Sequence, residues 1–310
     1  MKWLKQCRIF QAEDIPSDFI KSHAQIPTVL MLEDRLRVYI AVRPEPGLSM
    51  TTYIDLDIKN PMQILYVHEK PILELGEPGM FDEHGIMPNF IYREGNKHFL
   101  QYVGWSRRCS IPYSNWMGLA ASTDEGKSFK KLFRGPFLDR TLDEVYSSTG
   151  TWMIRKDDLY HLWYARGSDW HNVNGGLEHQ YNIVSATSID GINFDHENTE
   201  IFNRKQALES STRPTVIYKN NTYHMWFCYR GINDFRDGEN AYRIGYACSK
   251  DLKTWHRDDA LAGIDVSEEG WDSKMIAYPY VVETPYGIYM FYNGNGFGQS
   301  GFGYAVLEEK

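Results

Sequence analysis

Four acidic side chains stand a few residues ahead of four strand-like runs, each of which opens near a proline or glycine. These side chains are Asp82, Glu144, Glu209 and Asp272. Cleavage of a glycosidic bond uses such groups in pairs, because one carboxylic acid protonates the leaving oxygen while a second carboxylate acts as base or nucleophile. The four residues are therefore the candidate catalytic groups of the chain.

Cationic and hydrogen-bonding side chains stand at similar places and would hold a polar or anionic ligand. They are His23, His84, Arg213, Lys274 and Tyr278. Arginine and lysine suit an anion because they combine positive charge with several N–H donors. The alternative is structural: an acidic residue at a strand start accepts backbone N–H bonds, and Arg213 pairs with a carboxylate of a neighbouring repeat.

These positions follow a repeat along the chain. An aromatic-rich run recurs five times at intervals of about 62 to 65 residues, which is the signature of a repeat architecture. The runs are centred on Ile40, Tyr102, Tyr164, Phe227 and Tyr292. A second landmark precedes each centre by about 13 or 14 residues and keeps the same register. It is Pro27, Pro88, Gly150, Pro214 or Pro279.

Each repeat reads as four short strands, rich in β-branched and aromatic residues and separated by Asn, Asp and Gly turns. Short strands at even spacing predict an all-β fold, here one five-bladed β-propeller of four-stranded antiparallel blades. The blades cover approximately residues 20–78, 79–141, 142–207, 208–268 and 269–310. The last repeat lacks a fourth strand, so we expect the N-terminal segment 1–11 to supply it and close the ring.

The first strand of each propeller blade lines the axis, so the residues before the five landmarks should converge on one funnel. The loops between second and third strands, residues 106–115, 167–180, 231–240 and 293–301, should form its rim. Trp105 and Trp170 lie in or beside them and would stack on a sugar ring. Trp163, Trp226 and Trp255 lie inside strand runs, where we expect them to pack between blades.

Composition narrows the classes of partner and cofactor. A formal net charge of −8 disfavours nucleic acid and anionic membrane surfaces as partners. The N-terminus has no continuous apolar segment typical of a signal peptide, and the four cysteines lack metal-ligand spacing. We therefore expect a cytoplasmic protein with no metal site and no cofactor, the alternative being a structural calcium ion near the axis.

Several motifs resemble those of known propellers. Ser122–Phe129, STDEGKSF, resembles the Asp-box turn of sialidases, a structural turn on the outer rim. The five-fold repeat with YHMWFCYRG, SKDLKTW and DSKMIAYPYVV resembles, over nearly the whole chain, the superfamily of arabinanases, invertases and levansucrases. Glycoside hydrolase families 43, 32 and 130 belong to it. The resemblance implies an enzyme that cleaves or transfers a glycosidic linkage in an oligosaccharide or glycosylated small molecule.

The resemblance also implies roles for individual residues. Glu209 is the nearest match to the acid of family 43, and Asp82 or Asp272 would act as the base or orient it. The first-blade Asp of that family is missing, because Gln25-Ile26-Pro27 stands in its place. In family 130 a single acid works with inorganic phosphate, which Arg213, Lys274, His23, His84 and Tyr278 would suit. Phosphorolysis and glycan binding without catalysis therefore remain alternatives to hydrolysis.

Overall fold

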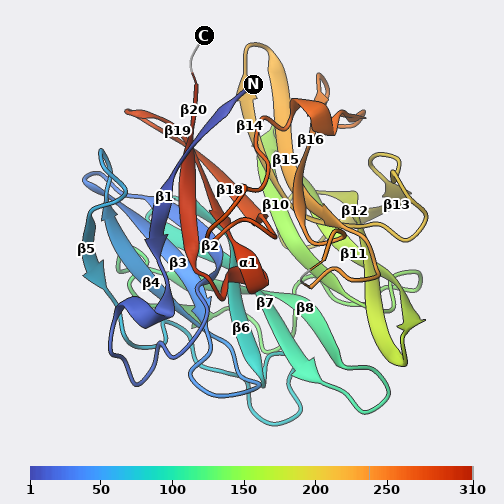
Figure 1. Ribbon diagram of the computed structural model, residues 1–310. Coiled ribbons are helices and arrows are strands. Elements are labelled where there is room, and N and C mark those ends of the chain that lie inside the picture. Colours follow the sequence, from blue (N-terminus) through green and yellow to red (C-terminus); the bar gives the residue numbers. More distant parts are fainter. Residues whose placement is uncertain (237, 309–310) are drawn as a thin grey trace.

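Five four-stranded antiparallel sheets form a ring in the computed structural model, which describes residues 1–236 and 238–308 (Figure 1). Blade one contains β2 (Gln25–Met31), β3 (Arg35–Val42), β4 (Met50–Asp57) and β5 (Ile64–Val67). Blade two contains β6 (Gly85–Glu94), β7 (Lys97–Arg107), β8 (Tyr113–Ser122) and β9 (Lys130–Lys131). Blade three contains β10 (Ser148–Lys156), β11 (Leu159–Val173), β12 (Gly176–Ser188) and β13 (Asp195–Glu200).

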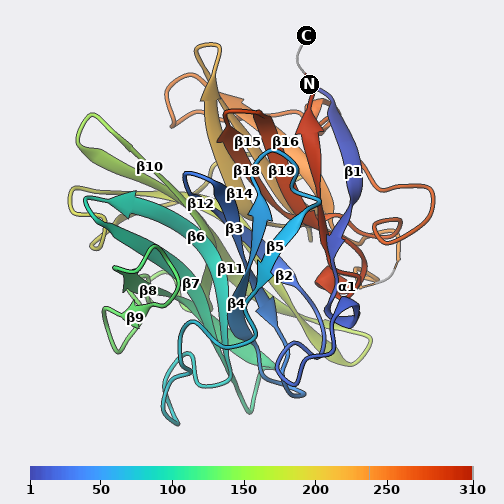
Figure 2. The ribbon, with the colours of Figure 1, turned by 90° about the vertical axis from the view of Figure 1, so that its left-hand side faces the viewer.

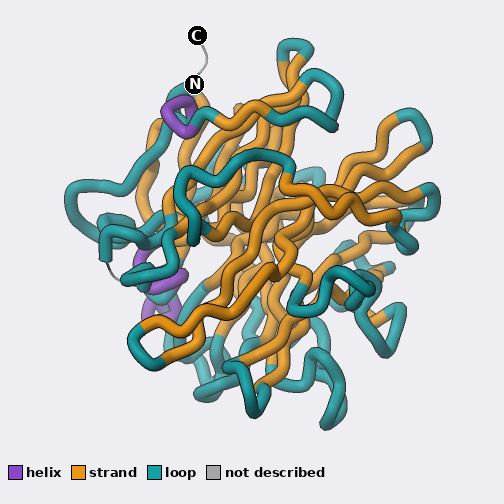
Figure 3. Tube along the Cα trace, turned by 90° about the vertical axis from the view of Figure 1, so that its right-hand side faces the viewer, coloured by secondary structure: helices purple, strands orange, loops and turns teal. Residues whose placement is uncertain are grey.

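Blades four and five complete the ring, and so the predicted five-bladed propeller is confirmed. Blade four contains β14 (Ser210–Lys219), β15 (Thr222–Arg230), β16 (Arg243–Ser249) and β17 (His256–Arg257). Blade five contains β18 (Ala277–Thr284), β19 (Gly287–Asn293), β20 (Phe302–Leu307) and β1 (Trp3–Phe10). The short helices are η1 (Ala12–Asp14), η2 (Asp259–Leu261) and α1 (Asn295–Gly298). Figure 3 shows strand as the dominant structure, with loops at both ends of the blades.

The ring closes as the sequence predicts. Strand β1 runs antiparallel to β20, with Trp3 opposite Leu307, and so covers the edge that β20 would otherwise expose (Figure 2). Trp3 meets Trp226 of blade four edge-on, with ring centroids 5.2 Å apart. The terminal strand therefore joins the last blade to its neighbour as well as completing its sheet.

Tryptophans pack between blades as expected. Trp163 of blade three and Trp255 of blade four meet edge-to-face at 5.4 Å, a favourable aromatic arrangement. Phe90, Trp152 and Tyr280 bring blades two, three and five together near the axis. The hydrophobic core thus lies between the blade faces.

Aspartates close the turns that follow three of the third strands. Asp124 accepts the backbone N–H groups of Lys127 and Ser128 at 3.0 and 3.1 Å, which confirms its predicted structural role. Asp190 and Asp251 make equivalent turns in the next two blades. Within the described residues, no helix is long and apolar enough to cross a membrane.

The inner strands are interrupted near the axis. Ile26, Gly150, Arg213 and Tyr278 all have φ between 55° and 61°, and each lies where pairing to the second strand skips. Such bulges re-aim side chains that would otherwise follow the sheet. Here they place one residue from each of four blades on a common cavity.

Candidate functional site

The four predicted carboxylates occupy equivalent places in four blades, and all are buried. Three of them accept a hydrogen bond from a tyrosine on the second strand of the same blade. The pairs are Asp82–Tyr102 (3.0 Å), Asp272–Tyr292 (3.0 Å) and Glu144–Tyr164. Burial, followed by the nearby carboxylate, raises the pKa of each of these tyrosines well above its ordinary value.

Each carboxylate also meets a basic side chain from the outer strand of its own blade. The contacts are Asp82–Lys131 (2.6 Å), Glu144–His196 (3.3 Å), Glu209–Arg257 (2.5 Å) and Asp272–Lys5 (2.8 Å). Each of these pairs therefore joins the loop before the inner strand to the outer strand. This is the geometry of an intrablade clamp.

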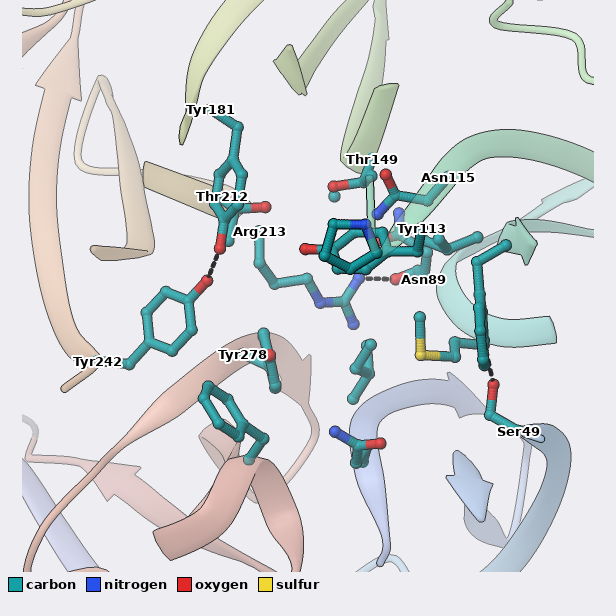
Figure 4. Close-up of a pocket in the computed structure, with 18 of the residues that line it drawn as sticks. Ser49, Asn89, Tyr113, Asn115, Thr149, Tyr181, Thr212, Arg213, Tyr242 and Tyr278 are labelled. Carbon is teal, nitrogen blue, oxygen red and sulfur yellow. Dashed lines mark hydrogen bonds between the residues drawn. The ribbon is translucent and has the colours of Figure 1, made fainter. Parts of the chain in front are cut away.

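An axial pocket of about 480 Å³ lies elsewhere, and none of the four carboxylates lines it. Its floor comes from the inner-strand bulges, and its wall from the loops between second and third strands (Figure 4). These loops are the predicted rim, and each contributes lining residues. The repeat register predicted correctly where the four carboxylates lie along each blade. Their side chains, however, lie against the face of the blade and do not point toward the axis.

Arginines dominate the charge of the axial pocket. Four of them line it, against a single carboxylate, Glu178, among the lining residues that the structure describes. The four arginines are Arg43, Arg213, Arg230 and Arg236. Glu178 accepts two hydrogen bonds from Arg236, at 2.6 and 3.1 Å. The remaining three arginines make no ion pair with any described carboxylate.

Arg213 is the most deeply buried of the four, with 2% of its surface exposed. It crosses the axis from blade four and donates to the carbonyls of Asn89 and Pro27 and, at 2.9 Å, to the Thr28 hydroxyl. Burial lowers its pKa to about 10. The guanidinium also lies 5.4 Å from the centre of the Tyr280 ring, and its Nε–H has no hydrogen-bond partner among the described residues.

Arg230 is also buried and likewise bonds to neutral acceptors. It donates to the carbonyls of His179 and Gly231, at 2.7 and 2.8 Å, and through Nε to the Tyr181 hydroxyl at 3.1 Å. Its guanidinium lies 3.7 Å from the centre of the Phe235 ring, a cation–π contact. Tyr181 in turn shares a hydrogen bond with Tyr242 (Figure 4).

The predicted binding residues divide into two groups. Arg213, Tyr278 and Trp105 line the axial pocket. His23, His84, Lys274 and Trp170 do not. Trp170 instead stacks on His179 at 4.3 Å, and His84 contacts Glu83 at 3.5 Å. Burial, aided by the positive charge of Arg43, lowers the pKa of His23 to about 4.

Sequence reasoning missed Arg43, Glu178, Tyr181, Arg230 and Tyr242. They lie at the ends of second and third strands and in the loops between them, whereas the repeat register points to the first strands. A signal was present, because basic residues recur where second strands end, at Arg43, Arg107 and Arg230. No cluster of three or more His, Cys, Asp or Glu side chains suited to a metal ion occurs in the described part of the chain.

Comparison with known proteins gives close relatives in one organism. No family model matches the chain. Uncharacterized proteins MT1551 and Rv1502 of two Mycobacterium tuberculosis strains are each 33% identical over 310 residues, covering 99% of this chain and 100% of theirs. The chain belongs to the family of these two proteins.

Solved structures share the fold at much lower identity. One of them, a glycoside hydrolase, has a TM-score of 0.74 at 15% identity, covering 98% of this chain and 90% of its own. A thermostable family-43 glycoside hydrolase gives 0.67 at 16%, covering 93% and 91%. A structure titled for the GH130 family of mannoside phosphorylases and hydrolases gives 0.69 at 14%, covering 99% and 93%. The predicted resemblance to these five-bladed propellers is thus confirmed for the fold.

Proposed function

We propose that the protein is a carbohydrate-active enzyme that cleaves or transfers a glycosidic linkage in its axial pocket. The pocket lies at the propeller axis, is large enough for a short oligosaccharide, and mixes aromatic with hydrogen-bonding side chains, as sugar and cofactor sites do. The shared fold with glycoside hydrolases and phosphorylases supports this class of substrate. The expected substrate is an oligosaccharide or a glycosylated small molecule.

The arginines carry a narrower proposal, namely that the substrate or a co-substrate is an anion. A buried cation without a counter-ion is costly, and a bound anion would offset that cost. Arg213 and Arg230 are such cations within the described structure, and the half-buried Arg43 adds a third positive charge. A neutral sugar would leave their charge uncompensated, whereas a phosphate group would accept several of their N–H bonds.

Among reactions on glycosides, this pocket suits phosphorolysis better than hydrolysis by two carboxylates. Glu178 is the one described lining carboxylate, and both of its oxygens already accept from Arg236. Hydrolysis requires a second carboxylate to activate water or attack the sugar. Phosphate is itself the nucleophile, so phosphorolysis needs only positioning cations and one proton donor.

Reverse phosphorolysis tests this proposal without requiring that the natural glycan be known. Purified protein would be incubated with a panel of sugar 1-phosphates and acceptor sugars, and release of inorganic phosphate measured. We expect release with at least one pair, and an Arg43→Gln variant should raise the KM for the sugar phosphate about tenfold, as for loss of one charge-assisted hydrogen bond. Arg134→Gln is the matched control, because Arg134 is 82% exposed and lies outside the pocket.

Other outcomes would replace the proposal with a defined alternative. Cleavage of oligosaccharides at the same rate with and without phosphate would show hydrolysis. Binding of acidic glycans on an array, with no product under either condition, would show a glycan-binding propeller. The Glu178–Arg236 pair favours that second candidate, because it leaves no lining carboxylate without a cation among the described residues.

A further inference from the structure

Two tyrosine hydroxyls meet at the wall of the axial pocket. Tyr181 lies in β12 of blade three, and Tyr242 directly precedes β16 of blade four; both line the pocket (Figure 4). Their oxygens are hydrogen-bonded to each other. This hydrogen bond crosses the interface between the two blades.

Counting protons shows that this pair has a donor to spare. Two neutral phenols carry two O–H protons, and the bond between them uses one. Arg230 also donates to the Tyr181 oxygen. This bond occupies a lone pair of the oxygen and leaves both phenol protons unaffected. No other described residue hydrogen-bonds to either hydroxyl. One O–H proton is consequently available to a molecule in the pocket.

Burial decides which hydroxyl presents that proton. Tyr242 is 2% exposed, whereas Tyr181 is partly exposed. The Tyr242 hydroxyl has no hydrogen-bond partner other than Tyr181 among the described residues, so donation to Tyr181 is what satisfies its buried proton. Tyr242 is therefore assigned as the donor of this bond, which leaves the Tyr181 O–H free for a molecule in the pocket.

We propose that Tyr181 is the proton donor of the reaction, positioned by Tyr242 and Arg230; this rests on the proposed glycosidic chemistry. As the bond between the sugar carbon and the leaving oxygen breaks, the Tyr181 proton passes to that oxygen. The electron pair of the broken bond stays with the leaving oxygen, and an oxygen of hydrogen phosphate forms the new bond to carbon. The proton of the resulting sugar hydrogen phosphate then returns to the Tyr181 oxygen.

The surroundings of Tyr181 fit the charge that this step creates. After the transfer, the Tyr181 oxygen is anionic and accepts from both the Tyr242 O–H and the Arg230 Nε–H. Hydrogen bonds to charged groups are about twice as strong as neutral ones, so the two donors stabilise this state more than the resting one. Glu178 does not need to give a proton in this mechanism.

Removing the two hydroxyls separately provides the test. Turnover would be measured for Tyr181→Phe and Tyr242→Phe, using a disaccharide substrate and a 4-nitrophenyl glycoside of the same sugar. Tyr181→Phe should lower kcat on the disaccharide about 100-fold or more, the usual contribution of a general acid. The loss should be below about tenfold on the nitrophenyl glycoside, whose leaving group needs no proton. Tyr242→Phe should lose less than Tyr181→Phe on the disaccharide.

Binding of inorganic phosphate, measured by calorimetry, separates this proposal from the proposed function. Wild-type protein that binds no phosphate would reject the proposed phosphorolysis, and the comparison of the two glycosides would then still decide whether Tyr181 is the proton donor. Tyr286→Phe, at an exposed turn, is the matched control. Equal losses on both substrates, or wild-type turnover of the disaccharide by a folded Tyr181→Phe, would overturn the proposal.

Discussion

Glu209 and Arg257 form an ion pair whose side chains are 1% and 5% exposed, and Asp259 shares the arginine. Two charges removed from water in this way stabilise the fold only together, because either one alone keeps the desolvation cost without the attraction. Asp82 and Asp272 are buried as well, but the side chains of their partners Lys131 and Lys5 are 21% and 23% exposed. At the scale of single residues, we therefore expect these carboxylates to stabilise the blades.

Substitutions at the Glu209–Arg257 pair should therefore affect stability and spare turnover. We expect Arg257→Met to cost about 3–5 kcal/mol in the free energy of unfolding, because it leaves Glu209 buried and unpaired. The Glu209→Leu/Arg257→Met double variant should lose less, as urea titration would show. Glu209→Gln should keep its turnover while folded; a loss of 100-fold would restore Glu209 as a catalytic candidate.

Sequence reasoning identified equivalent carboxylates but not their direction. The five-fold register placed Asp82, Glu144, Glu209 and Asp272 correctly in equivalent loops. Whether such a side chain faces the axis or the blade depends on its partners, Lys131, His196, Arg257 and Lys5, which come from distant outer strands. Arg213 and Tyr278 lie on the inner strand itself, and both line the axial pocket; their role in binding stays a prediction.

At the scale of elements, three aspartate turns join third and fourth strands. Hydrogen bonds from the backbone N–H groups of Thr254 and Lys253 lower the pKa of Asp251 to about 2. A carboxylate whose pKa is lowered by folding stabilises the folded state above its unfolded pKa, about 3.9. That stabilisation is lost as the pH falls from about 4 toward 2.

Asp251→Ala should reveal this pH dependence. We expect a loss of about 1 kcal/mol at pH 7, since the carboxylate satisfies turn N–H groups as a helix cap does, and less at high salt because the group is exposed. The difference from wild type should shrink between pH 4 and pH 2, as chemical denaturation at several pH values would show. Asp18→Ala, an exposed position outside these turns, should change stability by less than about 0.5 kcal/mol at every pH.

At the scale of the whole molecule, the repeat in the sequence was sufficient to predict the ring. Two landmarks in each of five repeats gave the number of blades, and the missing fourth strand of the last repeat indicated where the N-terminus belongs. The axial pocket was harder to predict, because Arg43, Glu178, Tyr181 and Arg230 come from three blades. Only the closed ring brings them together.

Closure should depend strongly on one side chain. Trp3 is 4% exposed and packs against Trp226, whereas its neighbour Leu4 is 39% exposed. Trp3→Ala should therefore cost about 3–5 kcal/mol in the free energy of unfolding. Leu4→Ala should cost less than about 0.5 kcal/mol, and equal losses in guanidinium titrations would contradict this account of closure.

The pairing of β1 with β20 also sets an order of events during synthesis. Blades one to four are each continuous in sequence and can form their sheets as they leave the ribosome. Strand β1 is made first but has no partner until β20 emerges. Its backbone therefore stays unpaired while every other blade is translated. Closure of that long loop comes last, and this interval is when the nascent chain is most open to pairing with other chains.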